Sequence, residues 1–121
     1  MATVYSLGPG TYALGAAQTG NVSSDVLDRG SDRGTAALVI TSAVGATPTV
    51  TAAIVGSVDG TDYFSVPYAL VATPSTWVVA AITITSAVTT TYLLQPSQAW
   101  RYIRVDYSAN TNVTLTTTAY I

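Results

Sequence analysis

The sequence contains no cysteine, histidine, lysine or glutamate. The lack of cysteine excludes a disulfide framework and thiol chemistry. The lack of histidine and lysine excludes a Ser-His-Asp arrangement and a Schiff-base lysine, and a zinc ion would find only aspartate ligands. Because the usual catalytic groups are missing, the sequence predicts a protein that is not an enzyme and that needs no cofactor.

Charge is also scarce, since charged residues make up 8% of the chain, against about 25% in a usual globular protein. The net charge of −2 provides no basic surface for nucleic acid or for an anionic membrane. Every apolar run is interrupted by threonine, serine, glycine or proline, so no run reaches the roughly 18 residues of a membrane-spanning helix. We therefore expect no nucleic-acid or membrane partner, and a surface covered by threonine, serine and neighbouring subunits.

What the sequence does contain is alternation of β-branched and polar residues. About seven or eight short segments of this kind predict an all-β fold, an antiparallel β-sandwich of the Ig-like or jelly-roll type. Turns are predicted at residues 45–48 and 108–112, where glycine, proline and asparagine gather. The predicted strands cover residues 35–44, 49–58, 63–66, 77–85, 89–94, 100–107 and 113–121.

The first 24 residues differ from the rest of the chain. Glycine and proline at Gly8-Pro9-Gly10 and Gly15 break any sustained element there. We expect either an N-terminal arm that docks on a neighbouring molecule or a short first strand followed by a loop. The predicted domain organisation is an arm over residues 1–24 and a β-sandwich over residues 25–121.

The polar tetrad Asp59-Gly60-Thr61-Asp62 lies between two predicted strands. Asp-Gly at such a position is a strong signal for a β-hairpin, because glycine adopts positive φ without a Cβ clash. Asp59, Gly60 and Asp62 are therefore predicted hairpin-turn residues. A calcium site at Asp59 and Asp62 is the alternative, since carboxylate and hydroxyl oxygens are calcium ligands, but the closing glutamate of an EF-hand loop is missing. We expect no metal.

Two further groups of residues are candidates for contacts. The doubled Asp-Arg-Gly of residues 28–34 predicts an exposed turn or, alternatively, a subunit contact between arginine and aspartate side chains. The aromatic residues near Arg101 and Arg104 are typical of single-strand or sugar stacking, although burial of the aromatics with arginines lying over them is the commoner arrangement. The candidate residues for such a stacking surface are Tyr63, Tyr68, Trp77, Tyr92, Trp100, Tyr102, Tyr107 and Tyr120.

Three segments together carry a resemblance. Two strands joined by a Gly/Thr/Pro turn occupy residues 35–50, a strand leads into the turn at residues 56–63, and Trp100-Arg101-Tyr102-Ile103-Arg104-Val105 precedes a threonine-rich last strand. This arrangement resembles the small β-sandwich head decoration (capsid cement) proteins of tailed bacteriophages. A similar order of segments occurs in discoidin-like carbohydrate-binding jelly rolls.

The resemblance implies a structural virion protein, made in the host cytoplasm and located on the capsid exterior. Its implied partners are the major capsid protein, whose subunit contacts it stabilises, and further copies of itself in a homotrimer. A phage tail or fibre module, or a carbohydrate-binding module on the virion surface, stays open as the alternative. The residues predicted to contact other subunits or the shell are Tyr5, Leu7, Tyr12, Asp28, Arg29, Asp32, Arg33, Trp77, Trp100, Arg101 and Arg104.

Overall fold

The fold is built from strands, as predicted. The computed structural model describes residues 4–6, 10–29, 36–95 and 100–121, and this part of the chain contains no helix. None of its elements is therefore a helix long and apolar enough to cross a membrane. The strands are β1 (Val4–Ser6), β2 (Thr11–Gln18), β3 (Val26–Asp28), β4 (Ala36–Ser57), β5 (Phe64–Ser65), β6 (Tyr68–Leu70), β7 (Ile82–Ile84), β8 (Thr89–Leu94) and β9 (Tyr102–Tyr120).

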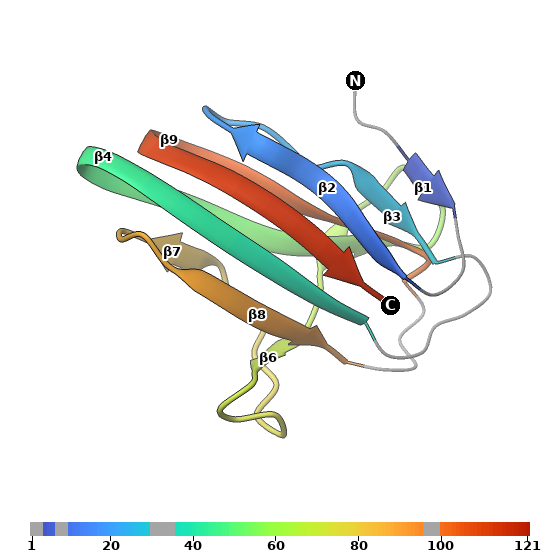
Figure 1. Ribbon diagram of the computed structural model, residues 1–121. Coiled ribbons are helices and arrows are strands. Elements are labelled where there is room, and N and C mark those ends of the chain that lie inside the picture. Colours follow the sequence, from blue (N-terminus) through green and yellow to red (C-terminus); the bar gives the residue numbers. More distant parts are fainter. Residues whose placement is uncertain (1–3, 7–9, 30–35, 96–99) are drawn as a thin grey trace.

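All of these strands belong to one connected sheet. Its order is β1-β3-β9-β4-β8-β6, with β2 paired to β9 and with β5 and β7 paired to β4. Every pair is antiparallel except β1 with β3, which is parallel. The two long strands β4 and β9 pair from Ala37 opposite Tyr120 to Ser57 opposite Tyr102. They form the spine on which the shorter strands are placed (Figure 1).

Both long strands bend in the middle without ending. The β4–β9 register shifts between Val44 and Thr49 and again before Thr51, and Thr47, Ala109 and Asn112 have positive φ. Such bulges add a residue to one strand, which increases the twist and lets the ladder continue around a corner. The turns predicted at residues 45–48 and 108–112 are therefore wrong as strand ends, because both are bends inside continuous strands.

The bends fold the sheet over on itself. The hydroxyl groups of Tyr107 and Thr117 lie 2.5 Å apart and share a hydrogen bond, although ten residues of straight strand would span about 33 Å. The two halves of β9 must therefore face each other, and Figure 1 shows β4 and β9 doubling back in this way. The core lies between the two halves of the sheet.

The core follows the predicted alternation. In β4 the even-numbered Val50, Ala52 and Ile54 are buried, and in β9 the odd-numbered Val105 and Leu115 are buried. The period of two is kept on both sides of each bend, so both halves of each long strand turn an apolar face inward. The alternation seen in the sequence therefore corresponds to an inward and an outward face at these positions.

The N-terminal segment contributes to this core. Within the predicted arm, β2 pairs with the end of β9 from Thr11 to Gln18, and the side chain of Leu14 is fully buried. Residue 24 is therefore no boundary between a separate arm and the sheet. The sequence did not predict this strand clearly, because the register of β2 shifts at Gly15 and interrupts the alternation of apolar and polar residues.

The segments after β5 match the prediction unevenly. β8 has the predicted bounds, Thr89–Leu94, whereas only Ile82–Ile84 of the predicted strand 77–85 is a strand. Before it, Val78 exchanges two backbone hydrogen bonds with Tyr68, and residues 71–81 are otherwise irregular and exposed. The β propensity of this stretch does not decide its structure, because no neighbouring strand is available along most of it.

Candidate functional site

The Asp59 turn is built by local hydrogen bonds. Oδ1 of Asp59 accepts hydrogen bonds from the backbone N–H groups of Thr61 (2.8 Å) and Asp62 (3.0 Å) and from the hydroxyl of Ser57 (2.8 Å). Gly60 has φ +82°, and its N–H donates to the Ser57 hydroxyl (2.9 Å). The hairpin is confirmed, since β5 pairs with the end of β4. These bonds stabilise the turn in the way an Asx turn does.

The electrostatics of this turn follow from the same contacts. The N–H groups of Thr61 and Asp62, and then the hydroxyl of Ser57, hold the pKa of Asp59 below its usual value, because each bond favours the carboxylate. No group of three or more His, Cys, Asp or Glu side chains is close enough to hold a metal ion in the part of the chain that the structure describes. The arrangement fixes the backbone of the turn.

Two of the charged residues that were predicted to lie in an exposed turn are buried. Asp28 and Arg29 are 4% and 5% exposed. Nε and Nη2 of Arg101 donate to the two carboxylate oxygens of Asp28 at 2.8 and 3.1 Å, and Arg29 donates to the backbone carbonyl of Trp100 at 2.5 and 3.0 Å. The exposed-turn prediction is therefore wrong for Asp28 and Arg29, because charged groups this far inside a protein need such partners.

The contact with Asp28 also changes the pKa of Arg101. The hydrogen bonds and charge of Asp28 raise the pKa of Arg101, so the Arg101 guanidinium stays charged at any physiological pH. Asp28 and Arg101 come from β3 and from the residue before β9, and their contact ties the start of β9 to β3. The remaining residues of the doubled motif, at 30–34, lie outside the described residues.

A second ion pair lies further along β9. Arg104 lies 3.9 Å from the ring centroid of Tyr63, and its Nε forms an ion pair with Oδ1 of Asp106 at 2.9 Å. The same Oδ1 accepts a hydrogen bond from the hydroxyl of Ser23. Arg101 lies over the ring of Tyr102 at 5.1 Å. The predicted placement of arginines over aromatic rings is therefore confirmed, although the Tyr63 and Tyr102 rings are only half-buried. Both arginines are engaged by groups of their own chain.

The aromatic residues do not share one environment. Tyr68, Tyr92 and Tyr107 are buried in the core, where burial is the main cause that raises the pKa of each, that of Tyr107 to about 12. Trp100 packs against the core and lies 6.1 Å from Phe64, whereas Trp77 is exposed. These three tyrosines are therefore not available for a sugar or a base to stack on.

Within the part of the chain that the structure describes, the strand segments of one half of the folded sheet carry no charge. We call the part formed by β2, residues 36–44 of β4, β6, β8 and residues 113–120 of β9 the neutral half, because these segments contain no charged residue. The other half holds the ion pairs described above, and we call it the charged half. The described charged residues are Asp25, Asp28, Arg29, Asp59, Asp62, Arg101, Arg104 and Asp106.

An exposed apolar segment follows strand β6, which lies at the edge of the neutral half. No charged residue occurs from Tyr63 to Trp100, and residues 70–81 are all exposed. We call residues 70–81 the apolar segment, and Figure 1 shows it projecting beyond β6. Large apolar side chains are seldom left together in water unless another surface covers them. Those exposed here are Leu70, Val71, Trp77, Val78 and Val79.

The other predicted contact residues are spread over the chain. Trp77 belongs to the apolar segment, whereas Tyr12 packs against the core. The backbone of Tyr5 belongs to β1, and Leu7, Asp32 and Arg33 lie outside the described residues. The apolar residues around Trp77 were missed because β propensity placed them in a strand. The signal that would have found them is the charge-free run from Tyr63 to Trp100.

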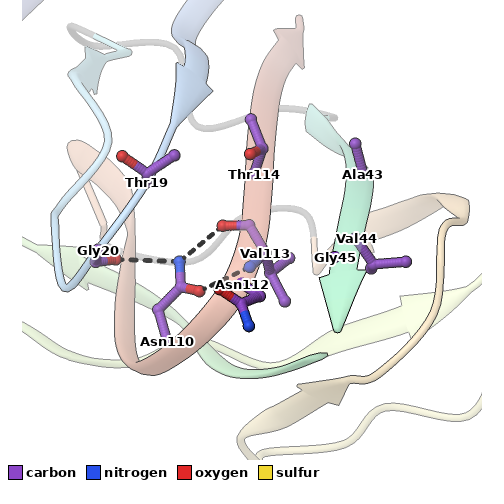
Figure 2. Close-up of a pocket in the computed structure, with 9 residues that line it drawn as sticks. All are labelled: Thr19, Gly20, Ala43, Val44, Gly45, Asn110, Asn112, Val113 and Thr114. Carbon is purple, nitrogen blue, oxygen red and sulfur yellow. Dashed lines mark hydrogen bonds between the residues drawn. The ribbon is translucent and has the colours of Figure 1, made fainter. Parts of the chain in front are cut away.

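An open concavity of about 420 Å³ lies at the bend of β4 and β9. Asn110 lines this concavity, and its side-chain amide donates to the backbone carbonyls of Gly20 (3.1 Å) and Val113 (2.9 Å) and accepts from the N–H of Val113 (3.0 Å) (Figure 2). Asn112 donates to the carbonyl of Ala46. The amide groups thus join the two bends and the loop after β2, which explains why asparagine is used at these positions.

Comparison with described protein families finds no match to this chain, and comparison with curated proteins finds none either. Among solved structures, the chain is similar to the SPBc2 prophage-derived protein YomS, with a TM-score of 0.61 and 7% identity over 93% of this chain and 92% of that one. The two chains therefore share a fold.

A second solved structure that matches this chain is the N-terminal cellulose-binding domain of the Cellulomonas fimi β-1,4-glucanase C. Its TM-score is 0.36, at 19% identity over 93% of this chain and 75% of that one. A TM-score this low supports no conclusion about fold or function.

Proposed function

We propose that this chain is a structural protein of a phage particle, a capsid decoration protein that binds the outer surface of the head and stabilises contacts between major capsid subunits. The observation that carries the proposal is the exposed apolar segment beside a half of the sheet without charge. The phage context is supported by the name of the structurally similar protein, which is prophage-derived, and by the resemblance of residues 35–121 to cement proteins.

The physical basis is the low cost of covering such a surface. Charged groups are depleted at the centres of permanent interfaces, because each one that is buried must be desolvated and paired again. The apolar segment offers Val71, Trp77 and Val79 to a partner without that cost. Many identical weak contacts on a symmetric shell add up to tight binding. A strong single anchor is therefore unnecessary.

The wider assignment has three parts. The folded sheet fits the predicted β-sandwich, Ig-like or jelly-roll, since its halves face each other across one core. The partners are the major capsid protein and further copies of the chain, for which the resemblance implies a trimer. The location is the capsid exterior. A tail or fibre module would expose similar surfaces, and shell binding separates the two assignments.

The proposal is tested by sedimentation with undecorated shells assembled from the cognate major capsid protein. We expect the purified protein to sediment with the shells at a fixed ratio to capsid subunits. Val79→Asp places a charge in the apolar segment and should abolish binding, whereas Val58→Asp, at a valine of nearly equal exposure (55% against 59%) in the Asp59 turn, should bind normally. Failure of the unmodified protein to sediment with shells refutes the proposal.

A further inference from the structure

The Asp59 turn contains the pair of residues that is most open to chemical modification. Asp59-Gly60 is the only place in the sequence where an aspartate or an asparagine precedes a glycine. Because glycine has no Cβ to shield its backbone nitrogen, that nitrogen can approach the side chain of the residue before it. Both residues are exposed, so water also reaches them. The turn therefore brings together all the reactants of isoaspartate formation.

This reaction has two steps. The Gly60 nitrogen loses its proton and attacks Cγ of Asp59, so that a C–N bond forms while the bond from Cγ to one carboxyl oxygen breaks. That oxygen leaves as water, and the product is a five-membered succinimide ring. Water then adds to either ring carbonyl and opens the ring, either to aspartate or to isoaspartate. The water lost in the first step is regained in the second, so no further reactant is needed.

The hydrogen bonds of the folded turn oppose the first step. The N–H of Gly60 donates to Oγ of Ser57 at 2.9 Å, and this bond is lost when the nitrogen gives up its proton. Oδ1 of Asp59 accepts from the Ser57 hydroxyl at 2.8 Å and from the N–H groups of the two residues after Gly60 at 2.8 and 3.0 Å. The carboxylate must leave these donors before it turns toward the Gly60 nitrogen, and each broken bond adds to the barrier.

Ser57 is central to this protection because its hydroxyl holds both reactants. The side chain of Ser57 is fully buried at the end of β4, where Ser57 lies opposite Tyr102 of β9. The sheet therefore fixes the hydroxyl in place. The lowered pKa of Asp59, caused first by the N–H of Thr61, acts in the same direction, because the ionised carboxylate is a poorer target for a nucleophile than the protonated acid.

We propose that Asp59-Gly60 is the site at which this chain forms isoaspartate, and that the Ser57 hydroxyl keeps the reaction slow while the turn is folded. Isoaspartate routes the main chain through the former side-chain carbons, so the contacts of Oδ1 in the turn would be lost. The pairing of β4 with β5 follows directly from this turn. Ser57 is therefore a positioning residue that sets the chemical lifetime of the hairpin, whatever the chain binds.

The rate of isoaspartate formation, followed by enzymatic methylation of isoaspartate and by peptide mapping, tests the proposal. We expect modification at residue 59, at least about tenfold faster in the chain unfolded by urea than in the folded chain. Ser57→Ala should raise the rate in the folded chain roughly tenfold, the factor that corresponds to the loss of two ordinary hydrogen bonds. Ser65→Ala, at an exposed serine of β5 in the same hairpin, is the matched control and should leave the rate unchanged.

Two further variants separate the turn from the stability of the whole fold. Ile40→Val weakens the core in the neutral half and should not change the rate. Asp59→Asn keeps an accepting oxygen and releases ammonia in place of water, so its conversion changes the mass of the chain, and Ser57→Ala should accelerate this conversion too. The proposal is overturned if no isoaspartate forms at residue 59, if folding does not slow the reaction, if Ser57→Ala and Ser65→Ala give equal rates, or if Ile40→Val accelerates the reaction as much as Ser57→Ala.

Discussion

The hydrogen bond between Tyr107 and Thr117 gives the sharpest test of the folded sheet. Both side chains are buried, at 3% and 0% exposure, and their hydroxyls are 2.5 Å apart. Tyr107→Phe removes one hydroxyl and leaves that of Thr117 without this partner, away from water. Losing the bond costs about 1 kcal/mol and a buried polar group without a partner costs roughly 1–3 kcal/mol, so we expect a loss of about 2 kcal/mol.

Thr117→Val should cost a similar amount for the complementary reason, since it keeps the shape of the side chain and leaves the Tyr107 hydroxyl without its partner. The double variant removes both hydroxyls, so no polar group is left behind and its cost should be well below the sum of the two single costs. Urea unfolding of the four proteins gives the free energies, and we expect a coupling energy of about 1–3 kcal/mol. Strict additivity would refute the contact, and with it the folding of β9 upon itself.

Three further predictions concern stability. Leu14→Ala should destabilise the protein by about 2–5 kcal/mol, measured by urea unfolding, whereas Ala13→Ser at the exposed neighbouring position should be nearly neutral; equal effects would mean that β2 is a dispensable arm. Gly56→Ala should lower the free energy of unfolding by about 1–3 kcal/mol, because its Cβ would lie 2.8–2.9 Å from Val66 and the Trp100 side chain; an unchanged melting temperature would contradict the packing there. The pKa of Tyr107, raised to about 12 from 10.0, means that folding favours the neutral phenol, so this stabilisation is complete below pH 10 and is lost as the pH rises towards 12. Unfolding measured across this range should show a pH-dependent component, on the order of 2–3 kcal/mol, that Tyr107→Phe removes; a pH profile identical in both proteins would contradict it.

Much of the fold is readable from the sequence because it depends on local rules. The alternation of Val50, Ala52 and Ile54 with outward residues fixes which side of β4 faces the core. The pair Asp59-Gly60 fixes the hairpin, since its carboxylate and its positive φ act within a few residues. Each of these features needs only the nearest neighbours in the sequence.

The bends could not be predicted in the same way. Glycine, proline and asparagine accompany a turn that ends a strand and also a bulge that bends one. Whether β4 ends at Val44 or continues depends on β9, which supplies a partner on both sides of the bend. The burial of Asp28 likewise depends on Arg101, 73 residues later. Such long-range partners leave no local trace in the sequence.

Only part of the information about the candidate contact surfaces could be read from the sequence. The absence of charge between Tyr63 and Trp100 can be read directly. That the charge-free strands gather in one half of the sheet follows only from the topology, which places β8 and the ends of β4 and β9 together. The sequence therefore identified the surface chemistry, and the fold identified where it is presented.

The temperature at which undecorated shells disrupt, measured with and without saturating protein, tests the proposed function most directly. The unmodified chain and Val58→Asp should both raise the disruption temperature, and Val79→Asp should leave it unchanged although it remains folded. A disruption temperature that does not respond to the unmodified chain would contradict the assignment as a capsid decoration protein.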